Sequence, residues 1–274
     1  MSALGGTVTA AARAPSHLGR PRWLRSLAYW AYRYKRTWRG SITTSFLYPV
    51  IYLAALGVGL GSLVNHHVHT VSGVGYLEFL APGLLASTAM QVGADEAMYP
   101  VMDAIKWGRT YLAMLATPLT VRDVLRGHLA WITFRLVTVC AIYLAIMEAF
   151  GTLRSGLAVL AIPAGVLAGL AFVAPIMAFA GAQQNDRGFS ALYRFGLIPL
   201  FLFSGTFFPI SQLPRWLQFV AWATPLYHGV ALCRGLALGG LGVGPAVVHT
   251  AYLVVVVGIG YWLATRSYAK RLEI

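Results

Sequence analysis

Two adjacent carboxylates in an apolar stretch are the first candidates for chemistry in this sequence. Asp95 and Glu96 fall within residues 76–102, which are otherwise mostly apolar. A carboxylate at the centre of a bilayer costs about 3 kcal/mol, so something must solvate or pair these side chains. Either they line or gate a polar path, or they lie near the membrane interface and contact Arg135 or another helix. One such pair without a second embedded acid gives little support to a proton relay.

Histidines are the next candidates, as metal ligands or as hydrogen-bonding groups. His66, His67 and His69 lie together between the first two apolar stretches. Imidazole is a common ligand of transition metals. However, a metal site needs three or four ligands in a defined geometry, and this loop has no nearby Cys, Asp or Glu. We therefore expect a hydrated polar loop and no metal site. His228 follows Pro225 in a broken apolar segment, where its ring is expected to hydrogen-bond freed backbone, with substrate contact as a secondary role.

Motifs of two common catalytic sites are missing. A phosphate-binding loop needs Gly-x-x-x-x-Gly-Lys followed by Ser or Thr, whereas the three lysines are followed by Arg36, Trp107 and Arg271. A hydrolase built on Ser204 and His228 would lack the Gly-x-Ser-x-Gly elbow. We expect no catalytic residue and no cofactor bound by this chain. Any energy from ATP must then come from a second polypeptide.

Composition places the chain among membrane proteins. Of its 274 residues, 58% are hydrophobic and 11% are charged, against about 25% charged residues in soluble domains. The net charge of +13 comes without any base-reading module, so we expect no nucleic-acid partner. Basic residues beside apolar spans instead gain roughly 1 kcal/mol each near anionic inner-leaflet lipid. The two cysteines give no disulfide framework.

Six apolar stretches are long enough to cross a bilayer as helices. The predicted fold is therefore an all-α polytopic membrane protein with six transmembrane helices. Of the 21 Lys and Arg residues, all but Arg154, Arg215 and Arg234 fall on one side of this arrangement. The positive-inside rule makes that side cytoplasmic and places both termini there, in the plasma membrane of a bacterium. The predicted spans cover about 41–64, 76–102, 129–150, 157–182, 189–208 and 246–265.

The residues before the first span divide into two parts. Residues 1–19, rich in Ala, Gly, Ser and Thr, are expected to form a mobile cytoplasmic tail ahead of a domain over 20–274. In residues 20–39, Trp23, Leu27, Trp30 and Tyr34 recur at three- and four-residue steps among Arg and Lys. This pattern predicts an amphipathic helix in the inner interface. It serves either as a topogenic anchor or as a contact for a cytoplasmic partner.

Between the fifth and sixth spans, residues 209–235 are apolar but divided by prolines. Pro214 suits the first turn of a short helix, and Pro225 ends that helix and begins another. Irregular backbone at membrane depth must be protected by protein or by a wet cavity. The segment therefore predicts an external re-entrant helical hairpin, with Phe208 just before it.

That hairpin, with Phe208-Pro209, Leu213-Pro214 and Pro225-Leu226, resembles the external re-entrant helices of type-2 ATP-binding-cassette (ABC-2) transporter permeases. The stretches YLEFLAPGLLASTAM and YPVMDAIKWGRTYLAMLATPLTVRDVLRG are similar to the second span and following loop of the lipo-oligosaccharide (nodulation-factor) branch. Daunorubicin-type drug-export permeases are similar as well. The resemblance covers nearly all of residues 20–274.

The resemblance implies that the loop after the second span is a coupling helix, which docks on a separate nucleotide-binding subunit holding ATP and Mg. An ordinary interfacial loop is the alternative. The resemblance also implies pairing of the chain with itself or a related permease. Many relatives carry Gly-Glu where this chain has Gly127-His128, so a carboxylate role at that position is absent or altered. The implied coupling residues are Trp107, Tyr111, Leu112, Leu115, Arg122 and Arg126.

The expected function is that of an ABC export permease moving an amphiphile, such as a lipid-linked saccharide, glycolipid or hydrophobic drug. Candidate residues for its path or gate are Asp95, Glu96, Phe208 and His228. An ion- or proton-coupled transporter is the alternative, although it calls for ionisable groups near midplane and often for an internal repeat. An intramembrane enzyme is the weakest of the three.

Overall fold

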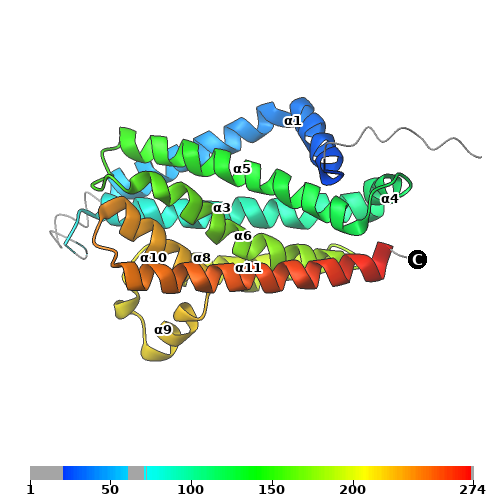
Figure 1. The fold of residues 1–274 in the computed structure, drawn as a ribbon. Coiled ribbons are helices and arrows are strands. Elements are labelled where there is room, and N and C mark those ends of the chain that lie inside the picture. Colours follow the sequence, from blue (N-terminus) through cyan, green and yellow to red (C-terminus); the bar gives the residue numbers. More distant parts are fainter. Residues whose placement is uncertain (1–20, 61–70, 72, 273–274) are drawn as a thin grey trace, which may run out of the picture.

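Long helices run side by side and account for most of the chain (Figure 1). A computed structural model describes residues 21–60, 71 and 73–272, and no β-strand forms within those ranges. The predicted tail and the three loop histidines lie outside the described residues. The helices are α1 (Trp23–Tyr52), η1 (Leu53–Leu60), α3 (Tyr76–Met102), η2 (Asp103–Trp107), α4 (Thr110–Leu115), α5 (Val121–Ala149), η3 (Ala158–Leu160), α6 (Ala161–Ala182), α7 (Arg187–Ala191), η4 (Leu192–Leu197), α8 (Ile198–Phe203), η5 (Ile210–Gln212), α9 (Arg215–Trp222), α10 (Pro225–Leu238) and α11 (Val243–Leu272).

Three described helices are both long and apolar enough to cross a membrane: α5, the joined η3 and α6, and α11. The other predicted spans are largely helical where the structure describes them, in α1 with η1, in α3, and in α7 through α8. Several boundaries differ from the prediction, and α11 continues to Leu272, beyond the predicted end at residue 265. α5 begins at Val121, eight residues earlier than expected, and α8 ends at Phe203 instead of reaching residue 208.

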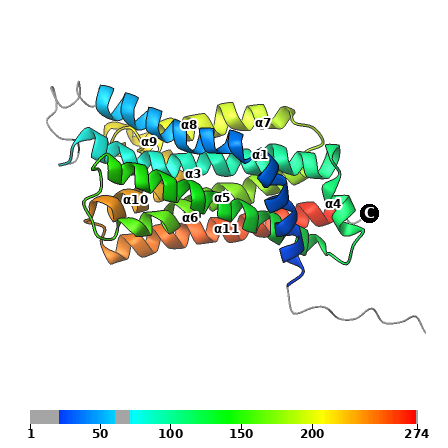
Figure 2. The same ribbon diagram turned by 90° about the horizontal axis from the view of Figure 1, so that it is seen from above.

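The first helix corrects the predicted division at residue 40. Helical structure is continuous from Trp23 to Leu60, with no break between the amphipathic stretch and the first apolar stretch. Figure 2 shows that α1 nevertheless bends, so that its first part lies across the end of the bundle and its second part runs along it. Because of this bend, one helix includes both the stretch predicted as an amphipathic helix and the start of the stretch predicted as the first span.

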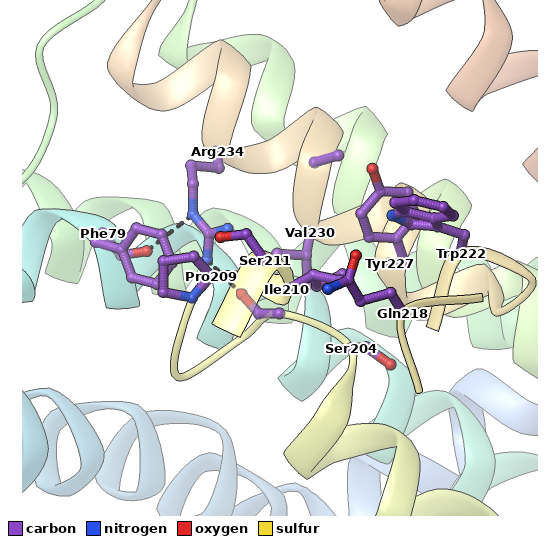
Figure 3. A pocket seen from close by; sticks show the side chains of 12 residues that line it. Phe79, Ser204, Pro209, Ile210, Ser211, Gln218, Trp222, Tyr227, Val230 and Arg234 are labelled. Atoms are coloured by element: carbon purple, nitrogen blue, oxygen red, sulfur yellow. Dashed lines mark hydrogen bonds between the residues drawn. The ribbon is translucent and has the colours of Figure 1, made fainter. Parts of the chain in front are cut away.

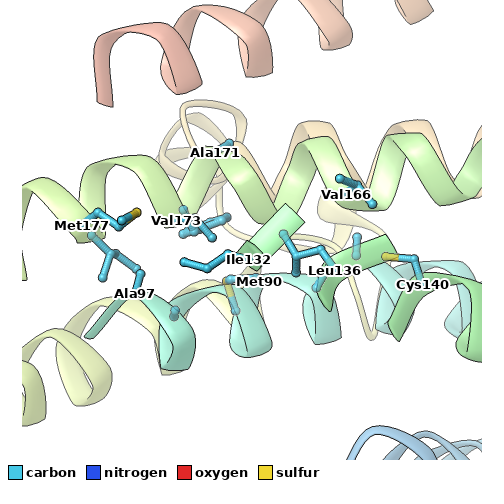
Figure 4. Packing of buried hydrophobic residues seen from close by; sticks show 14 of the residues in the cluster. Met90, Ala97, Ile132, Leu136, Cys140, Val166, Ala171, Val173 and Met177 are labelled. Carbon is cyan, nitrogen blue, oxygen red and sulfur yellow. The ribbon is translucent and has the colours of Figure 1, made fainter. Parts of the chain in front are cut away.

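Close helix packing in the centre depends on small residues. A Cβ atom on Gly93 of α3 would lie 2.8 Å from Cγ2 of Val173 in α6, and one on Gly260 of α11 would lie 2.6 Å from Cδ of Pro175. Small residues allow this approach, which is how helices gain packing energy where lipid supplies no hydrophobic drive. Figure 4 shows the resulting core of α3, α5 and α6, with Met90, Ala97, Ile132, Leu136, Cys140, Val166, Ala171, Val173 and Met177.

The two ends of the bundle carry different short helices. α4 lies at the same end as the last turns of α11, whereas α10 and the start of α11 lie at the other end (Figure 1). α9 projects from the bundle near that second end, and its Trp216 and Phe219 side chains are 66% and 65% exposed. The predicted coupling segment and the predicted hairpin are therefore separated by the length of the bundle.

Candidate functional site

The predicted coupling segment forms a tight turn followed by a short helix. The chain leaves α3 through the π-helical turn η2 and then reverses at Arg109, whose φ of 48° lies in the left-handed region. α4 follows, and Thr120 then starts α5. The hydroxyl of Thr120 accepts a hydrogen bond from the backbone N–H of Asp123, whose carboxylate accepts one from the Thr120 N–H. This reciprocal cap fixes where the coupling segment ends.

A buried group of four rings, which we call the inner aromatic cluster, anchors α4. Its members are Trp30 of α1, Tyr111 of α4, His128 of α5 and Tyr268 of α11. The His128 imidazole stacks on the Trp30 indole with 3.8 Å between ring centroids, and Tyr111 lies 5.6 Å from Tyr268. The short helix is thereby connected to three long helices at once.

Hydrogen bonding within the cluster is specific. The Tyr111 hydroxyl is hydrogen-bonded to Nδ1 of His128. Burial raises the pKa of the Tyr111 phenol well above its ordinary value, so the hydroxyl stays protonated and available as a donor. The Nε2 atom of His128 is buried and has no hydrogen-bond partner among the described residues. An imidazole thus occupies the position at which a carboxylate was expected in relatives, and it serves in packing.

The first part of α1 makes further contacts with the coupling segment. Arg33 forms an ion pair of 2.9 Å with Asp103 of η2. Ser26 donates a hydrogen bond of 3.2 Å to the carbonyl of Val124, and the hydroxyls of Tyr29 and Thr110 lie 3.3 Å apart. The amphipathic stretch of α1 therefore contacts η2, α4 and α5.

The predicted coupling residues do not share one face. Tyr111 is fully buried in the cluster and Leu115 is half-buried, whereas Trp107 and Leu112 are 53% and 39% exposed. Leu112 therefore lies on a different side of α4 from Tyr111. Arg122 and Arg126 are exposed on the first turns of α5, where Arg126 donates to the Tyr261 hydroxyl at 3.2 Å. The exposed set, Trp107, Leu112, Arg122 and Arg126, will be called the outer coupling surface.

The two carboxylates of α3 have different surroundings. Glu96 accepts a hydrogen bond of 3.2 Å from Nε of Arg135 in α5, and Arg135 donates another of 2.6 Å to the Tyr34 hydroxyl. Arg135 is the partner that was named as the alternative to a path-lining or gating role for these residues. Asp95 is exposed, and it makes no hydrogen bond or ion pair with any residue that the structure describes. Of these two carboxylates, only Glu96 has an ion-pair partner among the described residues.

At the far end, residues 204–209 form a buried break after α8. Gly205 adopts a φ of 83°, and Ser204 and Thr206 are almost completely buried. The Thr206 hydroxyl lies 2.9 Å from that of Ser87 in α3, and Arg234 of α10 donates to the carbonyl of Gly205 at 2.8 Å. The Arg234 side chain thus supplies a hydrogen bond to a backbone carbonyl that lies outside any helix.

Two short helices, α9 and α10, occupy the segment that was predicted to form a helical hairpin. α10 begins at Pro225 as expected, and the Thr224 side chain caps it by accepting a hydrogen bond from the Tyr227 N–H at 3.4 Å. His228 meets the backbone as predicted, because its Nε2 lies 3.0 Å from the carbonyl of Trp222. Its Nδ1 also lies 2.7 Å from Nδ1 of His249, which joins α10 to α11.

A pocket opens between α3, the break after α8, and α9 and α10. Arg234 and Phe79 lie at one side of it, and Tyr227, Trp222 and Gln218 lie at the other (Figure 3). Phe208, predicted as a gate residue, is half-buried in the adjoining turn, and the next residue, Pro209, lines the pocket.

The positions of three residues in the structure do not follow from the sequence pattern. Arg234 was noted only as a basic residue on the sparsely charged side, although an arginine inside an apolar segment is itself a signal of a special role. Trp30 was assigned to an interfacial face but is buried. His249 gave no signal, because nothing local places it opposite His228.

Comparisons with known proteins agree with this architecture. The chain matches the family described as ABC-2 type transporter over residues 25–238. It is 31% identical over 250 residues to nodulation protein J of Rhizobium leguminosarum bv. viciae, covering 90% of this chain and 94% of that protein. It is 29% identical over 254 residues to nodulation protein J of Rhizobium meliloti (strain 1021), covering 91% and 92%. The chain therefore belongs to the ABC-2 type transporter family, as a membrane permease subunit that is not itself the ATPase.

Proposed function

We propose that this chain is the permease of an ABC exporter with six transmembrane helices and both termini in the cytoplasm. α1 with η1, α3, α5, α6, the run from α7 to α8, and α11 would be the six spans. The distribution of Lys and Arg supports this orientation. The end of the bundle that carries α4 would then face the cytoplasm, and the end that carries α10 would face outward.

The outer coupling surface would be the docking site for a nucleotide-binding subunit that hydrolyses ATP. The observation that carries this proposal is the two-sided character of α4. Leu112 is exposed on one side, whereas Tyr111 on the other is fixed to α1, α5 and α11 through the inner aromatic cluster. A partner that moves Leu112 would therefore move three long helices. Apolar anchors on a short helix are a common way of binding a protein groove.

An amphiphile is the proposed cargo. The similarity to nodulation proteins J supports the lipo-oligosaccharide branch that the second span and its loop resemble. Exposed apolar side chains along α8, α9 and α11 would suit the apolar part of such a molecule. A permease of six spans would pair with a second permease subunit to enclose the path, and Asp95 would face that shared space.

Co-purification tests the partner. The chain is expressed with the nucleotide-binding subunit encoded nearest to its gene, and one of the two carries an affinity tag. We expect a detergent-stable complex whose ATPase activity depends on this chain. Failure of every tested nucleotide-binding subunit to associate, with the chain folded, would contradict the proposal. An ion-coupled transporter would transport without such a subunit.

A further inference from the structure

The guanidinium of Arg234 is a cation without an acidic partner in the part of the chain that the structure describes. The Glu78 carboxylate, on the residue before Phe79, is bound to Arg154 by an ion pair of 2.6 Å. Arg234 itself is held by neutral groups, with Nε donating to the Phe79 carbonyl at 3.0 Å and Nη2 to the Gly205 carbonyl at 2.8 Å. Burying a cation without a counter-charge is costly, so an unpaired one points to a ligand.

The geometry leaves part of this guanidinium available. Its carbon lies 3.8 Å from the centroid of the Phe79 ring, which fixes the plane of the group. Nε and Nη2 are engaged with carbonyls, whereas Nη1 donates no hydrogen bond to any described residue. Arg234 also lines the pocket of about 370 Å³ shown in Figure 3. Nη1 of Arg234 is therefore a positioned hydrogen-bond donor at the edge of this pocket.

The rest of the pocket suits the remainder of an amphiphile. Tyr227 and Trp222 supply rings at the side away from Arg234, and Ile210 and Val230 supply apolar surface. Apart from the Tyr227 hydroxyl, the uncharged polar side chains among the described lining residues are those of Ser204, Ser211 and Gln218, and none of the described lining residues carries a carboxylate. Sites that combine apolar walls with a few fixed polar groups are typical of small-molecule binding.

We propose that this pocket binds the anionic group of an amphiphile, with Arg234 as the binding cation. This inference rests on the proposed function, because it makes the pocket a station at the outward end of the export path. A phosphate or a carboxylate would accept hydrogen bonds from Nη1, and such charge-assisted bonds are stronger than neutral ones. The anion would come from the headgroup of the amphiphile and not from free phosphate in solution.

Binding to the full chain, purified in neutral detergent without any ATPase subunit, tests this. The probes are dioctanoyl phosphatidate, the uncharged dioctanoylglycerol and inorganic phosphate, each titrated by calorimetry. We expect phosphatidate to bind at least about tenfold more tightly than dioctanoylglycerol, a difference of roughly 1.4 kcal/mol. Arg234→Gln should remove that preference, and Arg234→Lys should retain part of it. Equal binding of the two lipids to the wild type overturns the proposal, and so does equal or tighter binding of inorganic phosphate.

A second pair of variants avoids the backbone contacts of Arg234. Ser211 is exposed at the pocket and makes no hydrogen bond with the described residues, so its replacement should leave the fold intact. Ser211→Asp places a negative charge at the pocket and should weaken phosphatidate binding about tenfold through like-charge repulsion, whereas Ser211→Asn should not. Equal binding by these two variants overturns the proposal. The binding assay needs no ATPase subunit, so loss of the lipid preference and loss of co-purification report separately on the site and on the proposed function.

Discussion

The imidazole of His128 lies flat against the indole of Trp30, with the ring centroids 3.8 Å apart and the planes inclined by 8°. Both side chains are buried, and the same imidazole is hydrogen-bonded to the Tyr111 hydroxyl. Helices α1, α4 and α5 therefore meet at one ring. The proposed coupling through α4 needs this connection. α4 has only 6 residues and must be held by its neighbours to transmit a displacement.

Replacing His128 tests the inner aromatic cluster. His128→Glu would bury a carboxylate among rings, and we expect it to destabilise the fold by about 2–4 kcal/mol. His128→Phe keeps the stacked ring but loses the hydrogen bond from Tyr111, at a cost of about 1 kcal/mol. Thermal unfolding of the purified variants in detergent ranks their stabilities against that of the wild type. A His128→Glu variant as stable as the wild type would show that the ring is dispensable.

The outer coupling surface can be tested without disturbing the cluster. Leu112→Asp places a charge on an exposed position of α4 and should reduce co-purification of the nucleotide-binding subunit about tenfold, or roughly 1.4 kcal/mol. The matched control is Leu157→Asp, because Leu157 is also exposed but lies directly before η3, which packs against α10 and not against α4 among the described residues. The measurement is the amount of nucleotide-binding subunit that is pulled down with each variant. Equal recovery of the subunit with Leu112→Asp and with wild type would contradict the docking site.

The carboxylates of α3 should behave differently from each other. Removing Arg135 strands Glu96, so a double-mutant cycle of Arg135→Met and Glu96→Gln should give a coupling energy of about 1–3 kcal/mol in unfolding. Asp95→Asn should leave stability within about 0.5 kcal/mol, because Asp95 is exposed and unpaired among the described residues. Its effect should appear in transport instead. A coupling energy near zero between Arg135 and Glu96 would refute this division of roles.

Arg109 provides a test of the turn before α4. Its φ of 48° is unfavourable for most side chains but tolerated by Asn. Arg109→Asn should therefore preserve stability, whereas Arg109→Val should cost about 1–3 kcal/mol. Because both variants lose the same charge, their difference in thermal unfolding isolates the backbone conformation. Identical unfolding of the two would mean that the chain does not need the left-handed turn.

Much of the helical architecture follows from local sequence. Apolar runs longer than a bilayer and prolines at 214 and 225 are signals within a few neighbouring residues, and helices lie where those signals place them. The site residues are harder, because their partners are distant in the sequence. The pairing of His228 with His249 and the contact of Arg234 with Gly205 arise from packing between helices. The burial of Tyr111 could not be foreseen either, since a helix of six residues carries too little periodicity to orient it.

The central claim, that a separate ATPase drives this permease, is tested most directly by transport into sealed proteoliposomes. The vesicles contain this chain with its co-purified nucleotide-binding subunit, oriented with that subunit outside, and a fluorescent short-chain glycolipid is the reporter. We predict that accumulation inside the vesicles requires added ATP and Mg²⁺, and that it is lost with Leu112→Asp but kept with Leu157→Asp. Equal accumulation without ATP, driven by an ion gradient, would contradict the account.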